Sequence, residues 1–204
     1  MPGRTIDGEW YPSVTEVIPQ ALRPDFSCVP PEVLQIARER GTALHAAIDS
    51  HERNDSAPAP KSSSTVLPGF DAYQQFKKET GFRYEAGEFE VRSRIWRYVG
   101  HPDLLGWIGA ERVMIDIKYV AAFGAAYREY TALQTIGGYG PAWLEGHPHA
   151  PIFKFYALWL RMDGTFRLVP LEKRNAEMVF RACLVIAHEA RKLKKKNRND
   201  GGNK

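Results

Sequence analysis

The chain has 204 residues, a formal net charge of +4 at pH 7 and a pI near 9.0, and 44% of its residues are hydrophobic while 25% are charged. This length suits a single globular domain with a substantial core. No apolar run approaches the ~18 residues of a membrane span, and the N-terminus lacks a signal-peptide pattern. We therefore expect a cytoplasmic protein that makes no membrane contact.

The positive charge is a mild indication of a polyanionic partner. Much of the excess lies in the basic stretch 191–198. Such a run is typical of a solvated helix end, and contact with nucleic acid is the alternative. The two cysteines, Cys28 and Cys183, are far apart and form no CxxC pair, so we expect reduced thiols.

The first half of the chain favours helices. The stretch from Ser13 to Glu16 has the spacing of a capping box and predicts a short helix. Pro30-Pro31 opens a second helical stretch, which we expect to be interrupted near Gly41 and to resume afterwards. The segment 54–64, rich in Ser, Ala and Pro, predicts a mobile loop, and a third helix is expected over about 70–79.

From Glu88 onward the pattern changes to that of strands. Residues 89–99 supply the β-branched and aromatic residues of one extended stretch. Between 113 and 118, Val113, Ile115 and Ile117 alternate with the other three side chains, which predicts a strand with a core face. A helix is expected over about 125–143.

The last third of the chain predicts a hairpin and a helix. Residues 152–161 and 165–169 are separated by Asp163-Gly164, which indicates a type I′ turn. The final helix carries a predicted core stripe of Val179, Cys183, Ile186, Ala190 and Leu193. This order of elements predicts an α/β or α+β domain over 1–195, followed by a basic disordered tail at 196–204.

The stretch 104–115 must turn back on itself, and Gly109-Ala110 is the best candidate for a type II′ turn. That turn places Asp103 directly opposite Asp116, with Cβ atoms about 4.5–5.5 Å apart. Carboxylates this close repel each other unless a cation or a proton lies between them, and a hard divalent metal suits oxygen ligands. Lys118 falls on the same face as Asp116 because strand side chains alternate.

A metal between two carboxylates, with an ammonium beside it, suits phosphodiester hydrolysis. The lysine can orient or deprotonate the attacking water and offset charge in the transition state. The alternative is a surface hairpin whose acids and lysine form exposed ion pairs, because a slip of register would separate the two acids.

Pro102-Asp103, followed after twelve residues by Asp116-Ile117-Lys118, resembles the signature of the PD-(D/E)XK nuclease superfamily. Residues 40–45 resemble the RG-x-x-x-H helix of the branch that contains RecB nuclease domains, Cas4 and phage-type exonucleases. Residues 98–100 match the aromatic-x-Gly approach to the first acid of that branch, and residues 11–15 are similar to the opening of phage-type exonucleases. The resemblance covers about residues 10–140.

The resemblance implies a restriction-endonuclease-like α/β core, a mixed central sheet flanked by helices in a single domain. It assigns metal binding to Asp103, Asp116 and the Ile117 carbonyl, with His45 binding the metal or adjusting its site from the helix. Lys118 would activate water. Glu88 is the candidate extra acid, with Glu90 as its competitor. Gln134 and Tyr139 fall where the branch has Q-x-x-x-Y, to brace the site or contact DNA. Without the resemblance, His45 is interpreted as a core histidine.

Three features depart from the family pattern. Tyr119 follows the lysine where Thr or Ser is commoner. Gln134 and Tyr139 are one residue too far apart, and on a regular helix residue i+5 does not share a face with residue i. Two cysteines are too few for the four that hold an iron–sulfur cluster in some members, so no such cluster is expected.

The sequence thus predicts a DNA nuclease that uses Mg²⁺ or Mn²⁺, with a phage-type exonuclease in recombination or repair as the first hypothesis. The resemblance implies a single-strand annealing or recombination protein as partner, in a bacterial or phage-infected cell. A structure-specific endonuclease or RNA-directed nuclease is the second hypothesis. The third is a catalytically silent nucleic-acid-binding or inhibitory protein. Four tryptophans are interpreted as core or partly buried residues, and stacking on an unpaired base is the alternative for one of the four. They are Trp96, Trp107, Trp143 and Trp159.

Overall fold

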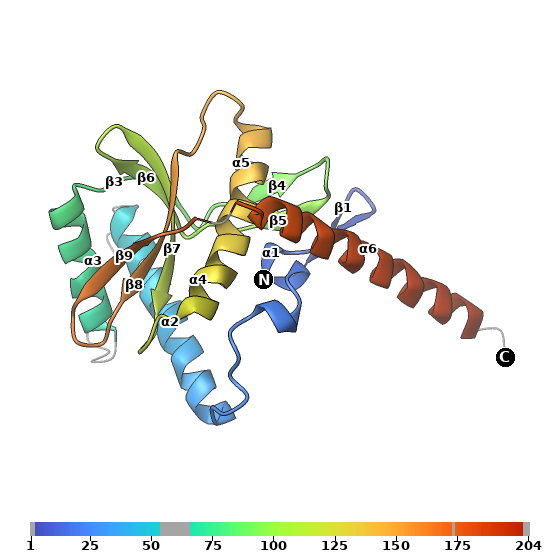
Figure 1. Cartoon of the computed structure of the whole chain (residues 1–204), viewed down its shortest axis with the longest axis horizontal. Coiled ribbons are helices and arrows are strands. Elements are labelled where there is room, and N and C mark those ends of the chain that lie inside the picture. Colours follow the sequence, from blue (N-terminus) through green and yellow to red (C-terminus); the bar gives the residue numbers. More distant parts are fainter. Residues whose placement is uncertain (1–2, 54–65, 173, 202–204) are drawn as a thin grey trace.

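The computed structural model describes residues 3–53, 66–172 and 174–201, and a five-stranded mixed sheet forms its centre (Figure 1). The strand order is β3-β6-β7-β8-β9; β7 and β8 are parallel and the other neighbours are antiparallel. The strands are β3 (Arg83–Gly87), β6 (Leu104–Ile108), β7 (Glu111–Tyr119), β8 (Lys154–Leu160) and β9 (Phe166–Pro170). The expected α/β fold, a mixed sheet flanked by helices in one domain, is confirmed.

Two helices cover one face of the sheet, α2 (Pro31–Glu52) and α3 (Leu67–Thr80) (Figure 1). Their apolar side chains pack against the alternate residues of β7 that the sequence assigns to the core. The central members are Leu44, Ile48, Phe70, Tyr73, Phe76, Val113, Ile115 and Ile117. This layer fixes α2 across the sheet.

The opposite face is covered by one helical segment and by α6 (Ala176–Gly201). The segment comprises α4 (Ala125–Ala132), the π-helix η2 (Leu133–Tyr139) and α5 (Gly140–Gly146), and it connects β7 to its parallel neighbour β8. Met114 and Leu105 of the sheet pack here with Leu133 and Phe180. β7 is therefore buried on both faces, as a central strand should be.

The N-terminal elements pack in the same layer as the helical segment and α6. β1 (Arg4–Ile6) and β2 (Glu9–Tyr11) form a ribbon, followed by α1 (Val14–Val17) and the 3₁₀ turn η1 (Gln20–Leu22). The capping box predicted for α1 is present in full, with reciprocal bonds between Ser13 and Glu16. β4 (Val91–Ser93) and β5 (Tyr98–Gly100) form a second ribbon, and Ser13 bridges Val99. Segments 11–15 and 98–100 therefore lie side by side.

The interruption expected near Gly41 is wrong, because α2 is continuous from Pro31 to Glu52. Among the described residues, a Cβ at Gly41 would meet no atom within 4 Å apart from its chain neighbours and the backbone of its own helix. Tertiary packing of Leu44 and Ile48 outweighs the ~1 kcal/mol that one glycine costs a helix. The predicted loop 54–64 lies outside the described residues, and the third helix is longer than expected at its N-terminal end.

Two predicted local structures differ from those observed. The extended stretch 89–99 is broken by a turn at 94–97, which leaves Ile95 and Trp96 exposed. The β8–β9 connection is a five-residue loop rather than a type I′ turn: Gly164 donates to the Arg161 carbonyl, and only Gly164 has a positive φ. Type I′ requires positive φ at both central residues, and Asp163 does not adopt it.

The core stripe predicted for the last helix is correct only in part. Val179 and Cys183 contact the core, but Ile186 and Leu193 are 69% and 61% exposed. Ala176, Phe180 and Leu184 supply the packed face instead. The reason is visible in Figure 1, where the C-terminal part of α6 extends beyond the body of the protein. The helix continues through Gly201, so it includes most of the stretch expected as a tail.

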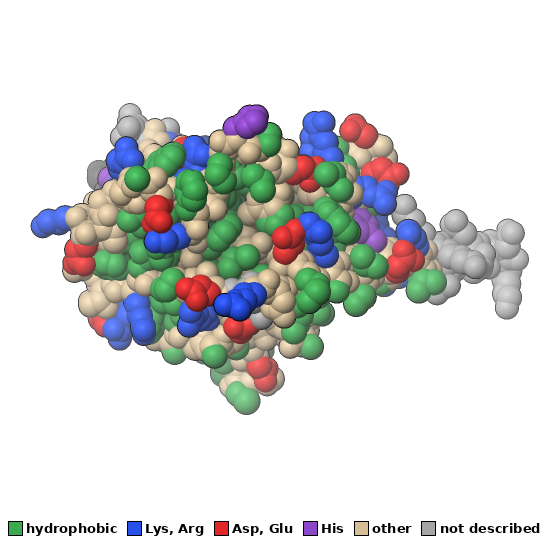
Figure 2. Space-filling model, turned by 45° about the horizontal axis from the view of Figure 1, so that its top comes forward, with side chains coloured by type: hydrophobic (Ala, Val, Ile, Leu, Met, Phe, Trp, Pro, Cys, Tyr) green, Lys and Arg blue, Asp and Glu red, His purple; other side chains and the backbone are tan. Residues whose placement is uncertain are grey.

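The surface mixes hydrophobic side chains with both signs of charge, as Figure 2 shows for one face. Among the described residues, no helix combines the length and apolar character needed to cross a bilayer.

Candidate active site

The hairpin of β6 and β7 has the register expected from its turn. Leu104 pairs with Ile115 and Ile108 pairs with Glu111, which leaves Gly109 and Ala110 as the turn. Gly109 has φ of 60°, and Ala110 is not among the described residues with positive φ, a combination that fits type II′. The predicted register is thus confirmed, and Asp103 lies one residue before the ladder, on the side of Asp116.

Asp103 is fixed by backbone groups of two neighbouring strands. Its Oδ2 accepts a hydrogen bond of 2.6 Å from the Ile117 amide of β7. Its carbonyl accepts a bond of 3.2 Å from the amide of Glu88, which follows β3. The carboxylate is therefore placed at the junction of three strands before any ligand arrives.

Asp116 and Lys118 form an ion pair on the same face of β7. The Lys118 Nζ lies 2.5 Å from Asp116 Oδ2, and the two side chains are only 17% and 5% exposed. The contact is close but lacks the alignment of a hydrogen bond. Burial lowers the pKa of Lys118, but the negative charges of Asp116 and Asp103 outweigh it and raise that pKa overall. The lysine is therefore an ammonium at neutral pH.

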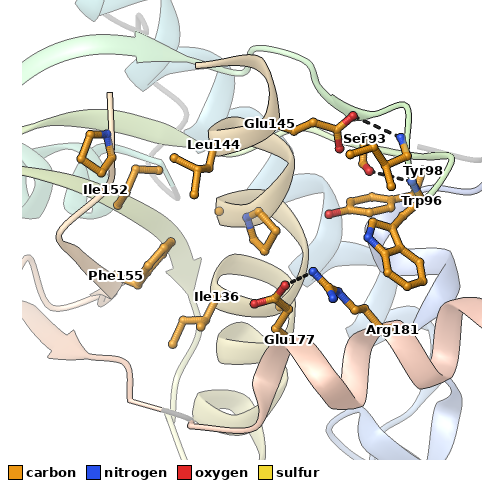
Figure 3. A pocket seen from close by; sticks show the side chains of 15 residues that line it. Ser93, Trp96, Tyr98, Ile136, Leu144, Glu145, Ile152, Phe155, Glu177 and Arg181 are labelled. Carbon is orange, nitrogen blue, oxygen red and sulfur yellow. Dashed lines mark hydrogen bonds and ion pairs between the residues drawn. The ribbon is translucent and has the colours of Figure 1, made fainter. Parts of the chain in front are cut away.

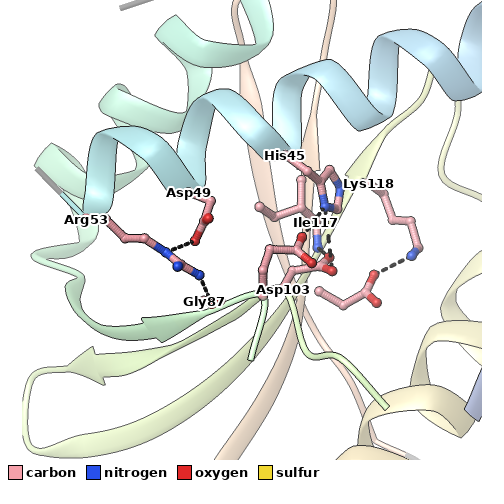
Figure 4. Close-up of polar contacts among 9 residues, drawn as sticks. His45, Asp49, Arg53, Gly87, Asp103, Ile117 and Lys118 are labelled. Atoms are coloured by element: carbon pink, nitrogen blue, oxygen red, sulfur yellow. Dashed lines mark hydrogen bonds and ion pairs between the residues drawn. The ribbon is translucent and has the colours of Figure 1, made fainter. Parts of the chain in front are cut away.

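His45 reaches the acids from α2 (Figure 4). Its Nδ1 lies 3.1 Å from Glu88 Oε1 and 3.6 Å from Asp103 Oδ1. Burial lowers its pKa, yet the charge of Asp103 and the hydrogen bond to Glu88 raise the pKa to about 9. The acids around His45 therefore stabilise a positive charge there, whether it is a proton on the imidazole or a bound cation.

Glu88, rather than Glu90, faces this group. Glu90 pairs with Arg4 and lies 4.0 Å from His101. Glu88 has a backbone φ of 48°, one of three positive values among the described non-glycine residues. A left-handed conformation costs energy for a residue with a side chain and is often retained at functional sites.

A polar clamp ties the end of β3 to α2 beside Glu88 (Figure 4). Arg53 donates to the Asp49 carboxylate at 2.8 Å and to the Gly87 carbonyl at 3.1 Å. Because Gly87 precedes Glu88, this clamp holds the Glu88 backbone against the helix that carries His45.

His45, Glu88 and Asp103 can each offer one ligand atom, and these three atoms lie within 4.8 Å of one another. Two carboxylates and an imidazole are a donor set that accepts a hard divalent cation. Burial and the charge of Asp116 raise the pKa of Asp103 to about 7, despite the opposing charges of His45 and Lys118. Burial penalises the charged carboxylate, and Asp116 and Glu88 add like charges; a bound cation would offset both effects, so the residues present fit a metal. Asp116 is outside this trio and is paired with Lys118 instead.

The π-helix brings Tyr139 to the acids. In η2 the hydrogen bonds span five residues, as from the Gly140 amide to the Thr135 carbonyl. Residues five apart then stack as residues four apart do in an α-helix, which absorbs the extra residue between Gln134 and Tyr139. Burial raises the pKa of the Tyr139 hydroxyl well above 10, and the charges of Asp116 and Asp103 raise it further.

Gln134 is buried in the same segment but makes no hydrogen bond to the acids, and its Oε1 has no partner in the described part of the chain. Tyr130, one α-helical turn earlier, was missed by the sequence reasoning. Burial raises its pKa, and the charges of Lys118 and Asp116 also act on it, which places it near both. Tyr130 precedes Gln134 by four residues, and this spacing could have predicted that the two side chains share one helical face.

Glycines allow the close packing that seats Tyr139. A Cβ on Gly100 would lie 2.5 Å from the Tyr139 ring. A Cβ on Gly137 would lie 2.8 Å from the Ala176 carbonyl of α6, and one on Gly138 would lie 2.8 Å from Val14 of α1. The aromatic-x-Gly approach therefore has a steric reason here, because β5 must pass beneath the tyrosine.

Two cavities lie near the helical segment. One, of about 840 Å³, opens beside Lys118 between α2, α4 and the 23–27 loop. The other, of about 420 Å³, lies between α5, α6 and the β4–β5 turn and is mainly apolar (Figure 3). Its polar groups are internally paired: Glu145 accepts from the Arg94 and Ile95 amides, and Arg181 pairs with Glu177. The first cavity is therefore the one connected to the candidate chemistry.

Comparisons with known proteins assign no family. No family model matches this chain, and no curated protein matches it. Among solved structures, an alkaline exonuclease from Laribacter hongkongensis shows 11% identity and a TM-score of 0.45, covering 93% of this chain and 94% of its own. A protein designated SSO0001 shows 10% identity and a TM-score of 0.37, covering 71% of each chain. Likenesses of this size carry no residue roles, so the function is argued from the site.

Proposed function

We propose that the protein is a metal-dependent DNA nuclease of the PD-(D/E)XK type. One observation carries the proposal: the Asp116–Lys118 pair at the end of β7 lies close enough to Asp103, a member of the trio with Glu88 and His45, for their charges to act on one another. Three carboxylates and a protonated lysine at the end of a central strand form an arrangement that can bind a cation and an anionic substrate together.

Each residue has a separate task in this proposal. His45, Glu88 and Asp103 would hold Mg²⁺ or Mn²⁺, with Asp116 and the Ile117 carbonyl as further ligands. The cation, when bound, supplies Lewis-acid polarisation of a phosphoryl oxygen and lowers the pKa of water. Lys118 orients or helps to deprotonate the attacking water and offsets charge on the phosphoryl oxygens. Gln134 and Tyr139 brace the face on which the DNA strand lies.

The finer proposal is a phage-type exonuclease that acts in recombination or repair, in the cytoplasm of a bacterial or phage-infected cell. The motif pattern across residues 10–140 supports it, and the same pattern suggests a strand-annealing or recombination protein as partner. The pairing of Ser13 with Val99 joins two of these motifs in space.

Incubation of linear and covalently closed circular DNA with Mg²⁺ or Mn²⁺, and then with EDTA, tests the activity. Degradation of linear DNA alone is expected, and cleavage of circles would favour an endonuclease. Lys118→Ala should abolish cleavage, while the matched control Lys154→Ala should retain it. Lys154 also pairs with a carboxylate, that of Glu111, but at the other end of the sheet. DNA binding without any metal-dependent cleavage would overturn the proposal in favour of a silent binding protein.

A further inference from the structure

The cavity beside Lys118 has walls of two different chemistries. Phe26 from the 23–27 loop and Tyr127 and Tyr130 from α4 supply half-buried aromatic rings. Arg23 and Arg38 supply guanidinium groups, and Asp25 is the single acid of the lining. Lys118 also lines the cavity but is paired with Asp116, so the two arginines face one carboxylate, that of Asp25. The cavity therefore favours an anion that also has a flat apolar surface.

Among the residues that the structure describes, neither arginine forms an ion pair with an acid. Arg23 donates to the carbonyls of Ile18 and Thr15 at 2.8 and 2.6 Å, which holds its guanidinium in place without cancelling its charge. Arg38 is exposed on α2 and forms no ion pair within the described part of the chain. It precedes His45 by two helical turns on the same face, about 10 Å along the axis.

The aromatic wall is held rigid from behind. Tyr127 meets Phe26 edge to face at 5.9 Å and stacks on Phe123 at 5.9 Å, and Phe123 stacks on Trp159 at 6.1 Å. Trp159 is itself anchored, because its indole N–H donates to the Val120 carbonyl at 2.7 Å. A ring fixed in this way presents its surface without the entropy cost of ordering on binding.

We propose that this cavity, the strand pocket, binds an unpaired nucleotide of the DNA strand that is cut. The base would stack on Tyr127, and Arg38 would contact a phosphate next to the one at Lys118. Aromatic stacking is tolerant of sequence and requires a base that has left the duplex. The cavity volume of about 840 Å³ suits this ligand, since sites that enclose small ligands measure about 300–1,000 Å³. This inference rests on the proposed nuclease function and adds that the bound strand is single.

Binding is measured in EDTA, so that no cleavage can occur. The probe is a short single-stranded DNA oligonucleotide that carries 2-aminopurine, whose fluorescence is quenched by stacking. The wild-type chain should quench it and should bind the matching blunt duplex more weakly. Tyr127→Ala should lose roughly tenfold in affinity together with the quenching, and Tyr127→Phe should keep both. Arg38→Gln should weaken binding and reduce its salt dependence.

Phe153→Ala is the matched control, because Phe153 is an exposed aromatic residue outside the cavity. Thermal melting establishes that each variant is folded; if Tyr127→Ala is not, the Arg38→Gln affinity and the wild-type quenching decide. Equal affinity of Tyr127→Ala and wild type would overturn the strand pocket. So would unquenched probe, or a free deoxynucleoside monophosphate that binds as tightly as the oligonucleotide.

The two proposals fail in different ways. Quenching in EDTA without cleavage of any DNA in Mg²⁺ or Mn²⁺ would refute the nuclease and leave the pocket as a single-strand binding site. Cleavage that is unaffected by Tyr127→Ala, with no loss of affinity, would support the nuclease and refute the pocket.

Discussion

Lys118 and Asp116 neutralise each other at 2.5 Å inside the protein, two residues apart on one face of β7. The pair lies beside Asp103, whose charge also acts on Lys118. The ammonium therefore has two possible uses: counter-ion of the acids when no metal is bound, and electrostatic partner of the phosphate when a metal neutralises the acids.

The first prediction concerns this exchange of counter-ions. Lys118→Met should lower the stability of the metal-free protein by roughly 3 kcal/mol, because a buried carboxylate loses its partner. Mg²⁺ or Mn²⁺ should raise the melting temperature of this variant more than that of the wild type, since the cation replaces the ammonium. Calorimetry with and without EDTA measures both effects, and equal stabilisation of the two proteins by metal would contradict this role.

The second prediction is that metal affinity rises with pH. The Asp103 pKa is raised to about 7 and that of His45 to about 9. A cation binds the deprotonated forms, so it must displace protons at lower pH. Affinity for Mn²⁺ should therefore increase as pH rises through 7 and again toward 9. Titration calorimetry in buffers of different ionisation enthalpy counts the protons released; Asp103→Asn should remove the component near pH 7.

The third prediction separates Glu88 from Glu90. Glu88→Gln should weaken Mn²⁺ binding by about tenfold or more, because a carboxylate is lost from the trio around His45. Glu90→Gln should leave the affinity unchanged, since Glu90 is paired with Arg4. Metal titrations of the two variants, one of which serves as the control of the other, give the comparison. A larger effect at Glu90 would reassign the extra acid.

The fourth prediction uses two glycines with opposite surroundings. Gly100→Ala should destabilise the protein by about 1–3 kcal/mol and reduce cleavage, because the new methyl group would displace Tyr139. Gly41→Ala should instead stabilise it by up to ~1 kcal/mol, since the site is helical and open. Denaturant unfolding measures both. A neutral Gly100→Ala variant with full activity would show that the position of Tyr139 is not constrained.

The fifth prediction concerns the Tyr139 hydroxyl. Tyr139→Phe preserves the ring that packs over Gly100 but removes the hydroxyl, whose pKa is raised by the charges of Asp116 and Asp103. We expect stability within about 1 kcal/mol of wild type, together with a clear loss of cleavage rate. Single-turnover cleavage is the measurement, and an unchanged rate would reduce Tyr139 to a packing residue.

Local rules were enough to predict the hairpin. A glycine-first turn and the alternation of strand side chains determine the pairing of Leu104 with Ile115, and hence which residues accompany Asp103 and Asp116. The capping box at Ser13 is equally local. In such cases the atoms that decide the structure are neighbours in the sequence.

The features that escaped prediction depend on distant contacts. A π-helix between residues 133 and 139 is stabilised by the packing of α1 and α6 against Gly137 and Gly138, which no local pattern reveals. A spacing that seemed to separate Gln134 from Tyr139 was therefore compatible with one helical face. The left-handed backbone of Glu88 depends on Asp103 and on the nearby Arg53 clamp, both far away in the sequence. Ile186 and Leu193 are exposed because the C-terminal part of α6 extends beyond the body of the protein.

The β6–β7 hairpin also determines which insertions the site can accept. A single added residue on one strand would turn every side chain beyond it to the opposite face and exchange Asp116 and Lys118 for core residues. One residue added to each strand would only move the turn outward and leave both acids where they are. Residues inserted between Gly109 and Ala110 lie outside the ladder and leave this pairing unchanged. The tip of the hairpin is therefore a place where an insertion, a label or a recognition loop can be added without disturbing the chemistry.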